Sequence, residues 1–135
     1  MPFQLHPQLA ADTHYVTELE NCQVLLMNDA RFPWLVLVPT VDNIRELYEL
    51  STTAQEQTNR AMLRAAQLLA KHTHADKMNV AALGNQVPQL HLHVIARYTT
   101  DAAWPGPVWG VGQAEPYSAT DAKTTVQELA ALITP

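Results

Sequence analysis

Residues 86–97, with the sequence QVPQLHLHVIAR, carry polar side chains that can do chemistry at every second position from residue 89 to residue 93. This alternation predicts a strand, because successive side chains of a strand point to opposite faces. Gln89, His91 and His93 would then stand in a row on one face, with neighbours about 6.6 Å apart. The alternate apolar residues, which would face the core, are Leu90, Leu92 and Val94.

Two chemistries suit such a row of side chains. Neutral histidines bind metals, but a zinc site needs three or four protein ligands, and this stretch supplies two histidines. Alternatively, one histidine is a nucleophile while its neighbours orient it and hold the anionic group that it attacks. A third interpretation is an amphipathic strand whose solvent face carries histidine without a catalytic role, since His-x-His alone is a weak motif. The residue types leave all three open.

The wider stretch 84–97, GNQVPQLHLHVIAR, resembles the signature of the histidine triad superfamily, His-φ-His-φ-His-φ-φ, in which φ is apolar. His91 falls on the central histidine of that pattern and His93 on the third, whereas Gln89 stands at the first. Members of the superfamily are nucleotidyl hydrolases and transferases that act on nucleoside phosphoramidates, dinucleoside polyphosphates or nucleotide sugars. The resemblance implies that His91 is the nucleophile.

The resemblance also implies a nucleotide-binding site around this stretch. Family members hold the ribose with a polar residue after the strand that corresponds to residues 23–27, and Asn28 occupies that position. Asn28 equally suits a turn, in which an asparagine bonds to its own backbone. Asn85 and Gln86 stand where a loop of the family brings donors to the phosphate. Trp34 is a second departure from the family, because several members carry a histidine there.

In the reaction that the resemblance implies, His91 attacks the α-phosphorus of a nucleoside phosphoester or phosphoramidate. The product is a nucleotidyl-histidine that water or another acceptor cleaves, while His93 positions the phosphate or the leaving group. The scheme requires neither a metal nor a cofactor. Two rivals remain: a nucleotide sensor without catalysis, and a metal-binding module in which His72 or His74 joins the two histidines.

Five strands are expected around this site, and we interpret them as one antiparallel sheet in an α+β domain. Glu20-Asn21 is a two-residue turn between the first two strands, and Gly84-Asn85 is a turn signal between the last two. Such short links join antiparallel neighbours. Alternating or apolar runs predict the strands at residues 15–19, 23–27, 34–38, 77–83 and 86–97.

A long helix that Ser51 opens should cover one face of this sheet. A terminal helix is expected at residues 120–133 with Thr120 or Asp121 as its N-cap. Shorter helical segments are expected at residues 5–11 and, after a cap at Asp42-Asn43, at residues 44–48. The positions of the long helix that follow 3.6-residue spacing and should face the sheet are Met62, Leu63, Ala66, Leu69 and Ala70.

The chain of 135 residues is expected to form a single domain, with a triad-like core at about 21–97 and an extension at 98–135. Its formal net charge of −5 argues against a nucleic-acid partner, which needs clustered Lys and Arg. The apolar run at residues 32–39 is too short to span a membrane, and the first residues carry no secretory signal. The single Cys22 suits a reducing compartment, so we expect a cytoplasmic protein.

The segment Trp104–Gly110 packs two Trp, two Pro and two Gly into seven residues. We expect it to be ordered but irregular, because large rings at low entropic cost suit a pocket rim, an interface or the cover of a sheet edge. The resemblance further implies a homodimer in which two sheets join. The expected partners are therefore a small-molecule nucleotide and a second copy of the chain.

Overall fold

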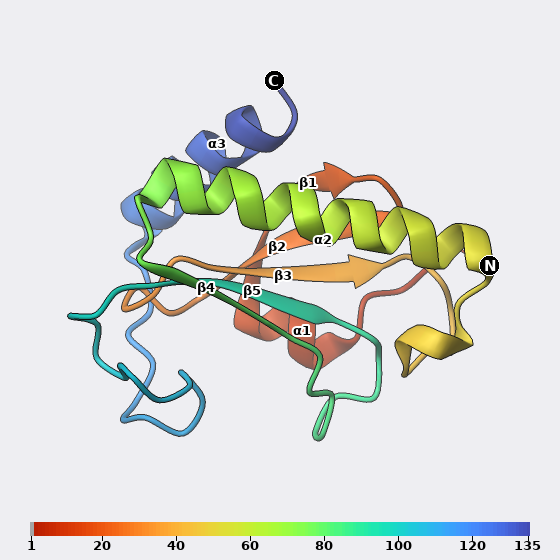
Figure 1. Ribbon diagram of the computed structural model, residues 1–135, viewed down its shortest axis with the longest axis horizontal. Coiled ribbons are helices and arrows are strands. Elements are labelled where there is room, and N and C mark those ends of the chain that lie inside the picture. The colour runs from red at the N-terminus through yellow and green to blue at the C-terminus, as the bar shows by residue number, and fades with distance from the viewer. Residues whose placement is uncertain (1) are drawn as a thin grey trace.

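The computed structural model describes residues 2–135 and contains a five-stranded sheet with helices and irregular segments on both faces (Figure 1). The strand order is β1-β2-β3-β5-β4, and all neighbours are antiparallel. The predicted α+β class and the five-stranded antiparallel sheet are confirmed. The strands are β1 (Thr13–Leu19), β2 (Cys22–Met27), β3 (Trp34–Pro39), β4 (Lys77–Ala81) and β5 (Leu92–Arg97); the helices are α1 (Pro7–Asp12), the 3-10 helix η1 (Leu47–Glu49), α2 (Thr52–Thr73) and α3 (Ala119–Ile133).

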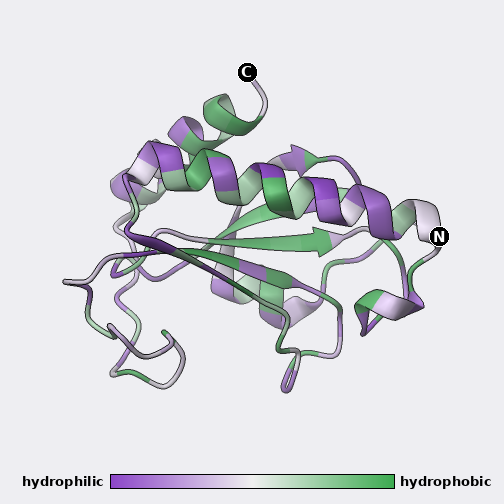
Figure 2. Cartoon of the chain, in the orientation of Figure 1, coloured by the Kyte–Doolittle hydropathy of each residue, from purple (hydrophilic) through white to green (hydrophobic). Residues whose placement is uncertain are grey.

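The central strands β3 and β5 are buried along their whole length, because both faces of the sheet are covered. Figure 2 shows β3 mainly in hydrophobic colours, whereas β5 combines hydrophobic and hydrophilic colours because its sequence, LHVIAR, includes His93 and Arg97. On one face α2 and α3 pack over a core that includes Val24, Leu37 and Val94. On the other face α1 and the segment after β5 pack over a second core that includes Phe32 and Ile95. Among residues 2–135, no helix combines the length and the hydrophobicity that crossing a bilayer requires.

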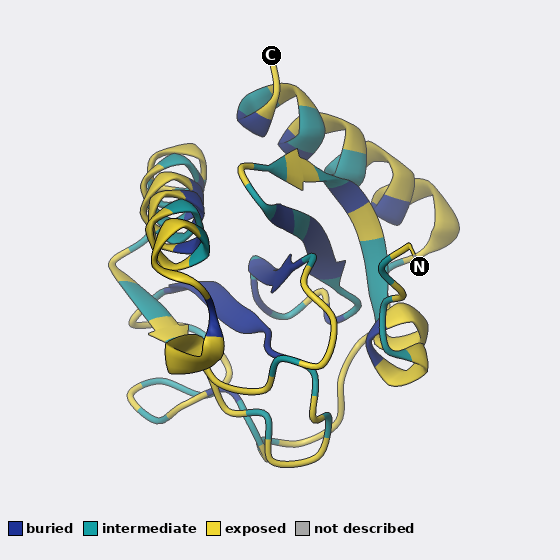
Figure 3. Cartoon of the chain, turned by 90° about the vertical axis from the view of Figure 1, so that its right-hand side faces the viewer, coloured by how far each residue is buried: buried dark blue, intermediate teal, exposed yellow. Residues whose placement is uncertain are grey.

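Helix α2 begins where the sequence predicts, because Ser51 is its N-cap and accepts a hydrogen bond from Ala54 N at 3.2 Å. The expected face is confirmed in part, because Leu69 is buried and Met62 and Ala66 pack against the core. Leu63 is instead 59% exposed, and the fully buried Ala61 and Ala65 are not among the predicted positions. Figure 3 shows the buried side of α2 turned toward the sheet.

Two predicted helix caps are wrong. Helix α3 starts from Ser118, whose hydroxyl accepts a hydrogen bond from Asp121 N at 3.1 Å, and not from Thr120 or Asp121. The segment after Asp42-Asn43 does not form a helix at residues 44–48 but a single 3-10 turn capped by Glu46. Asn43 itself adopts a left-handed conformation with φ of 59°, which is incompatible with the first residues of a helix.

The stretch before β5 is the main correction to the predicted sheet. The strand begins at Leu92, not at residue 86, and β4 ends at Ala81, so residues 82–91 form an irregular connection longer than the expected turn. Pro88 has no N–H for a ladder hydrogen bond. Leu90 N instead donates to Ile44 O at 2.8 Å, outside the sheet. His91 is therefore the residue just before β5, and His93 is the second residue within it.

Candidate active site

His91 is oriented by the backbone of its own segment. Its Nδ1 lies 2.6 Å from the carbonyl oxygen of Gln89. A carbonyl oxygen only accepts hydrogen bonds, so Nδ1 carries the proton of the neutral ring. The Nε2 lone pair is consequently free, which is the form that a nucleophilic imidazole requires.

His93 is oriented by a side chain from the neighbouring strand. The indole Nε1 of Trp34 on β3 donates a hydrogen bond to His93 Nδ1 at 3.0 Å. Burial, and in second place the nearby His91, lowers the pKa of His93 from its ordinary value of 6.5 to about 4. His93 is therefore neutral at physiological pH.

The two imidazoles meet at one cavity. Their ring centroids are 5.1 Å apart at an interplanar angle of 73°, and both rings line the same cavity of about 380 Å³. Among residues 2–135, His14 Nε2 is the one buried side-chain nitrogen or oxygen without a hydrogen-bond partner. Within the described part of the chain, neither His91 Nε2 nor His93 Nε2 has a hydrogen-bond partner. Since neither is among the fully buried atoms without a partner, both nitrogens keep some exposed surface.

We call this cavity the histidine compartment. Besides the two imidazoles, its wall includes Asn85 and Gln86 from the connection before β5, and Trp109 from the segment after it. Both predicted phosphate donors thus lie on the same cavity as His91. A volume of about 380 Å³ falls within the usual range for small-molecule sites.

A second cavity of about 390 Å³ adjoins the first, and we call it the Asn28 compartment. The two cavities share four lining residues, so they form one cleft with two parts. Asn28 Oδ1 accepts a hydrogen bond from Tyr117 N at 3.0 Å, which leaves the amide NH2 as the end available to a ligand. The residues common to both compartments are Asp12, Met27, Trp109 and Gly110.

Asp29 and Arg31, which both line the Asn28 compartment, form an ion pair. Arg31 Nη2 lies 2.8 Å from Asp29 Oδ2, and Arg31 Nη1 donates to Val111 O at 2.6 Å. Burial raises the pKa of Asp29, but hydrogen bonds from Arg31 and from the backbone N–H of Glu115 outweigh burial and lower it. These contacts hold the segment after β5 against the loop that carries Asn28.

Gln89 does not stand in the predicted row with the histidines. Its Oε1 accepts a hydrogen bond from His6 N at 2.9 Å, and its Nε2 donates to Gln4 O at 3.0 Å. Because residues 86–91 are not a strand, the alternation of their side chains does not carry Gln89 onto the face of His93. The Gln89 backbone oxygen, not its amide, contacts His91.

Several residues of the cleft give little or no signal in the sequence. Trp109 lines both compartments, while Trp104 lines neither and lies over the guanidinium of Arg97 at 5.6 Å. The density of aromatic residues in Trp104–Gly110 suits a pocket rim, an interface or the cover of a sheet edge, and it does not indicate which tryptophan lines the cleft. Asp12 and Met27 reach the cleft from α1 and the end of β2, and no local pattern marks either of them.

The metal-binding alternative has no ligand set. It needs His72 or His74 beside the two cleft histidines, but these residues lie at the C-terminal end of α2. Among residues 2–135, no group of three His, Cys, Asp or Glu side chains lies close enough together to hold a metal ion.

Comparison with known proteins identifies the family. The family model described as HIT domain matches residues 8–100, which is more than half of the chain. The chain belongs to the HIT domain family. A histidine triad protein from Marinobacter aquaeolei VT8 is 48% identical, with 98% of this chain and 97% of that chain covered and a TM-score of 0.95.

Two further solved structures resemble this HIT protein over nearly its whole length. A histidine triad protein from Bradyrhizobium japonicum is 42% identical, with 98% of this chain and 99% of that chain covered and a TM-score of 0.94. A histidine triad protein from Sinorhizobium meliloti 1021 is 45% identical, with 97% and 94% covered and a TM-score of 0.91. A search of curated proteins finds no match.

Proposed function

We propose that this HIT protein is a nucleotidyl hydrolase or transferase in which His91 is the nucleophile. The observation that carries the proposal is the 2.6 Å hydrogen bond from His91 Nδ1 to the Gln89 carbonyl, because it leaves the Nε2 lone pair free at a cleft. The substrate is a nucleoside phosphoester, a nucleoside phosphoramidate or a dinucleoside polyphosphate.

The proposed reaction has two displacements at the α-phosphorus. In the first, His91 Nε2 forms a bond to phosphorus while the bond from phosphorus to the leaving group breaks, and the leaving group departs with the bonding electron pair. In the second, the oxygen of water or of another acceptor bonds to phosphorus, the P–N bond breaks, and Nε2 regains its lone pair as the acceptor loses a proton. His93 Nε2 donates a hydrogen bond to the phosphoryl oxygens in both steps.

The two compartments suggest how a nucleotide is held. The Asn28 NH2 group is proposed to donate to a ribose hydroxyl, and Asn85 and Gln86 to donate to phosphate oxygens. In this arrangement the nucleoside occupies the Asn28 compartment and the α-phosphate lies at the histidine compartment. Gln89 contributes through its backbone oxygen, which orients His91, and not as a phosphate ligand.

A labelling experiment tests the proposal. The protein is mixed with an adenylate substrate that carries a 32P label at the α-position, and is then denatured at neutral to alkaline pH, where phosphoramidates survive. We expect label on wild-type protein and none on His91→Ala. His72→Ala, at the exposed end of α2, is the matched control and should be labelled like the wild type. Turnover by His91→Ala at the wild-type rate would remove His91 from the chemistry.

A nucleotide sensor is the second candidate, and one observation favours it. The residues His91 and His93 are 6% and 4% exposed, so the two rings offer little surface to a reacting phosphorus. A sensor binds nucleotide in the same cleft without covalent labelling. Saturable binding of AMP by calorimetry, combined with no turnover of a fluorogenic adenylate and no trapped label, would establish the sensor.

We also propose that the protein is a homodimer in which two sheets join through β4. This strand lies at the sheet edge and pairs with β5 alone, and an exposed edge favours pairing with another chain. Val80 on β4 and Leu83 just after it are 43% and 45% exposed, which supports an apolar contact there. Sedimentation velocity should give a dimer for wild type and for Leu63→Lys, but a monomer for Val80→Lys. A monomeric wild type at micromolar concentration would contradict this proposal.

A further inference from the structure

Two chemically equivalent imidazoles lie side by side in the cleft, yet a nucleotidyl transfer uses one of them as the nucleophile. The His91 and His93 rings are 5.1 Å apart, line the same compartment and are buried to a similar degree. A ring can attack phosphorus only through a nitrogen that faces the cleft and carries no proton. The selection between them therefore depends on which nitrogen of each ring holds the proton.

For His93, that proton is placed by Trp34. An indole N–H can donate a hydrogen bond but cannot accept one. Because Trp34 Nε1 lies 3.0 Å from His93 Nδ1, this nitrogen is the acceptor, and the proton of the neutral ring is on Nε2. For His91 the opposite holds, because the carbonyl of Gln89 requires a proton on Nδ1. The two rings thus present complementary atoms to the cleft, a lone pair from His91 and an N–H from His93.

We propose that Trp34 is a positioning residue that fixes His93 as the tautomer with its proton on Nε2, and thereby leaves His91 as the nucleophile of the pair. The tautomer assignment stands on the geometry alone, whereas its catalytic meaning rests on the proposed nucleotidyl transfer. In this arrangement His93 cannot compete for phosphorus, because one nitrogen is protonated and the other is occupied. It is instead a neutral hydrogen-bond donor beside the attacking atom.

The surrounding rings keep Trp34 in the donating position. Trp109 packs edge-on against Trp34 with centroids 5.9 Å apart and against His93 at 5.0 Å. Phe32, two residues before Trp34, packs edge-on against the indole with ring centroids 6.4 Å apart. Trp34 is 6% exposed, so water does not reach the indole N–H freely. Rotation of the indole or flipping of the His93 ring would break the hydrogen bond between Trp34 Nε1 and His93 Nδ1.

No other charged or titratable group near His93 among the described residues makes a hydrogen bond with its Nδ1. His91 presents its ring at an angle of 73° and bonds to Gln89. Asp12, the one carboxylate that lines the histidine compartment, is exposed and accepts a hydrogen bond from Gln8 Nε2 at 2.9 Å. Trp34 is therefore the sole donor to His93 Nδ1 among the described residues.

Nitrogen-15 NMR of the histidine rings tests the tautomer directly at neutral pH, in protein labelled at histidine. We expect wild-type His93 to show an unprotonated Nδ1 and a protonated Nε2, and His91 to show the reverse. In Trp34→Phe, which keeps a ring but removes the donor, His93 should become a mixture of tautomers and titrate at a higher pH. Trp104→Phe is the matched control, because Trp104 lies outside the cleft, and should leave both rings unchanged.

A proton on Nδ1 of wild-type His93 would overturn the proposal, and this measurement decides even if Trp34→Phe does not fold. Mapping of the trapped label by mass spectrometry tests the catalytic part. We expect label on His91 alone in wild type, and on both histidines in Trp34→Phe. Label confined to His91 in Trp34→Phe, despite mixed tautomers, would show that Trp34 does not select the nucleophile. Wild-type protein could show the expected tautomers by NMR and yet carry no label. That result would reject the proposed transfer, but Trp34 would still place the proton of His93 on Nε2.

Discussion

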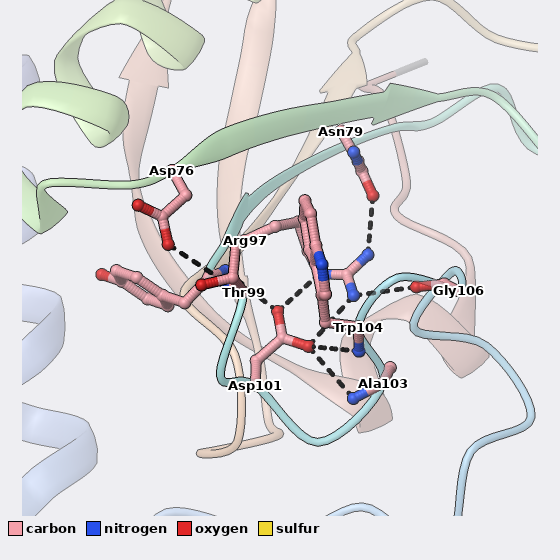
Figure 4. A network of polar contacts seen from close by, with 9 residues as sticks. Asp76, Asn79, Arg97, Thr99, Asp101, Ala103, Trp104 and Gly106 are labelled. Atoms are coloured by element: carbon pink, nitrogen blue, oxygen red, sulfur yellow. Dashed lines mark hydrogen bonds and ion pairs between the residues drawn. The ribbon is translucent and has the colours of Figure 1, made fainter.

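Arg97 and Asp101, four residues apart at the end of β5, form a buried ion pair with Arg97 Nε 2.7 Å from Asp101 Oδ2 and side chains 1% and 4% exposed. The guanidinium also donates to Asn79 Oδ1 on β4 and to Gly106 O, each at 2.8 Å (Figure 4). Hydrogen bonds from Arg97, and from the backbone N–H groups of the following turn, hold the pKa of Asp101 well below its usual range. The pair joins an edge of the sheet to the segment that carries Trp109.

Asp101→Asn should destabilise the fold strongly, because it leaves the Arg97 charge buried without its counter-ion. We expect the free energy of unfolding to fall by about 3 kcal/mol, measured by urea denaturation at neutral pH. Glu20→Gln is the control, since Glu20 pairs with Arg60 at 3.2 Å on the surface, and should cost under about 1 kcal/mol. Equal losses in the two variants would contradict the structural role of the buried pair.

The stability of the protein should decrease as pH falls from 6.5 toward 4, partly because of His93. Its pKa is 6.5 in the unfolded chain and about 4 in the folded protein, so the unfolded state binds more protons in this window and acidification favours it. A difference of this size corresponds to about 3 kcal/mol. The difference in unfolding free energy between wild type and His93→Gln should therefore change by this order between pH 7 and pH 4. A difference that stays constant with pH would show that His93 is not held neutral.

Nucleotide binding should be reported by Trp109 and not by Trp104. Trp109 is half-buried and lines both compartments, whereas Trp104 is stacked on Arg97 outside them. Titration with AMP should change tryptophan fluorescence in wild type and in Trp104→Phe by similar amounts, and the change should be much smaller in Trp109→Phe. Loss of the signal in Trp104→Phe with retention in Trp109→Phe would place the ligand elsewhere.

Gln89→Ala should release the N-terminal segment. The variant loses the hydrogen bonds to His6 N and Gln4 O, worth about 1 kcal/mol each. Hydrogen exchange of the His6 amide should become faster, while exchange in the central strands stays unchanged. Gln86→Ala changes an exposed residue on the same connection and should leave His6 protected. An unchanged exchange rate of the His6 amide in Gln89→Ala would show that the Gln89 hydrogen bonds do not hold the N-terminal segment.

The structure confirms the elements that depend on short-range sequence patterns. Apolar runs and two-residue alternation indicate the strands around residues 15–19, 23–27 and 34–38, and Ser51 marks the start of α2 as its N-cap. Each of these signals depends on neighbours within a few residues. Four residues that the family resemblance predicts for the site line one cavity: His91, His93, Asn85 and Gln86. Their roles stay predictions.

The misplaced elements depend on contacts between distant segments. Alternation at residues 86–91 predicts a strand, but Pro88 and the bond from Leu90 to Ile44 take this stretch out of the sheet. The hydrogen bond between Trp34 and His93 joins residues on two strands that no sequence pattern relates. Local patterns identify the chemical groups of the site, while tertiary contacts determine their protonation.

The cleft is lined by residues inside the HIT domain match and by residues beyond it. The match to the HIT domain covers residues 8–100 and includes both histidines, whereas Trp109 and Gly110, which line both compartments, lie beyond it. The family match therefore accounts for most of the lining of both compartments, but not for Trp109 and Gly110, two of the residues that the compartments share. A substitution at Trp109 or Gly110 would change the wall common to both compartments and leave both histidines unaltered.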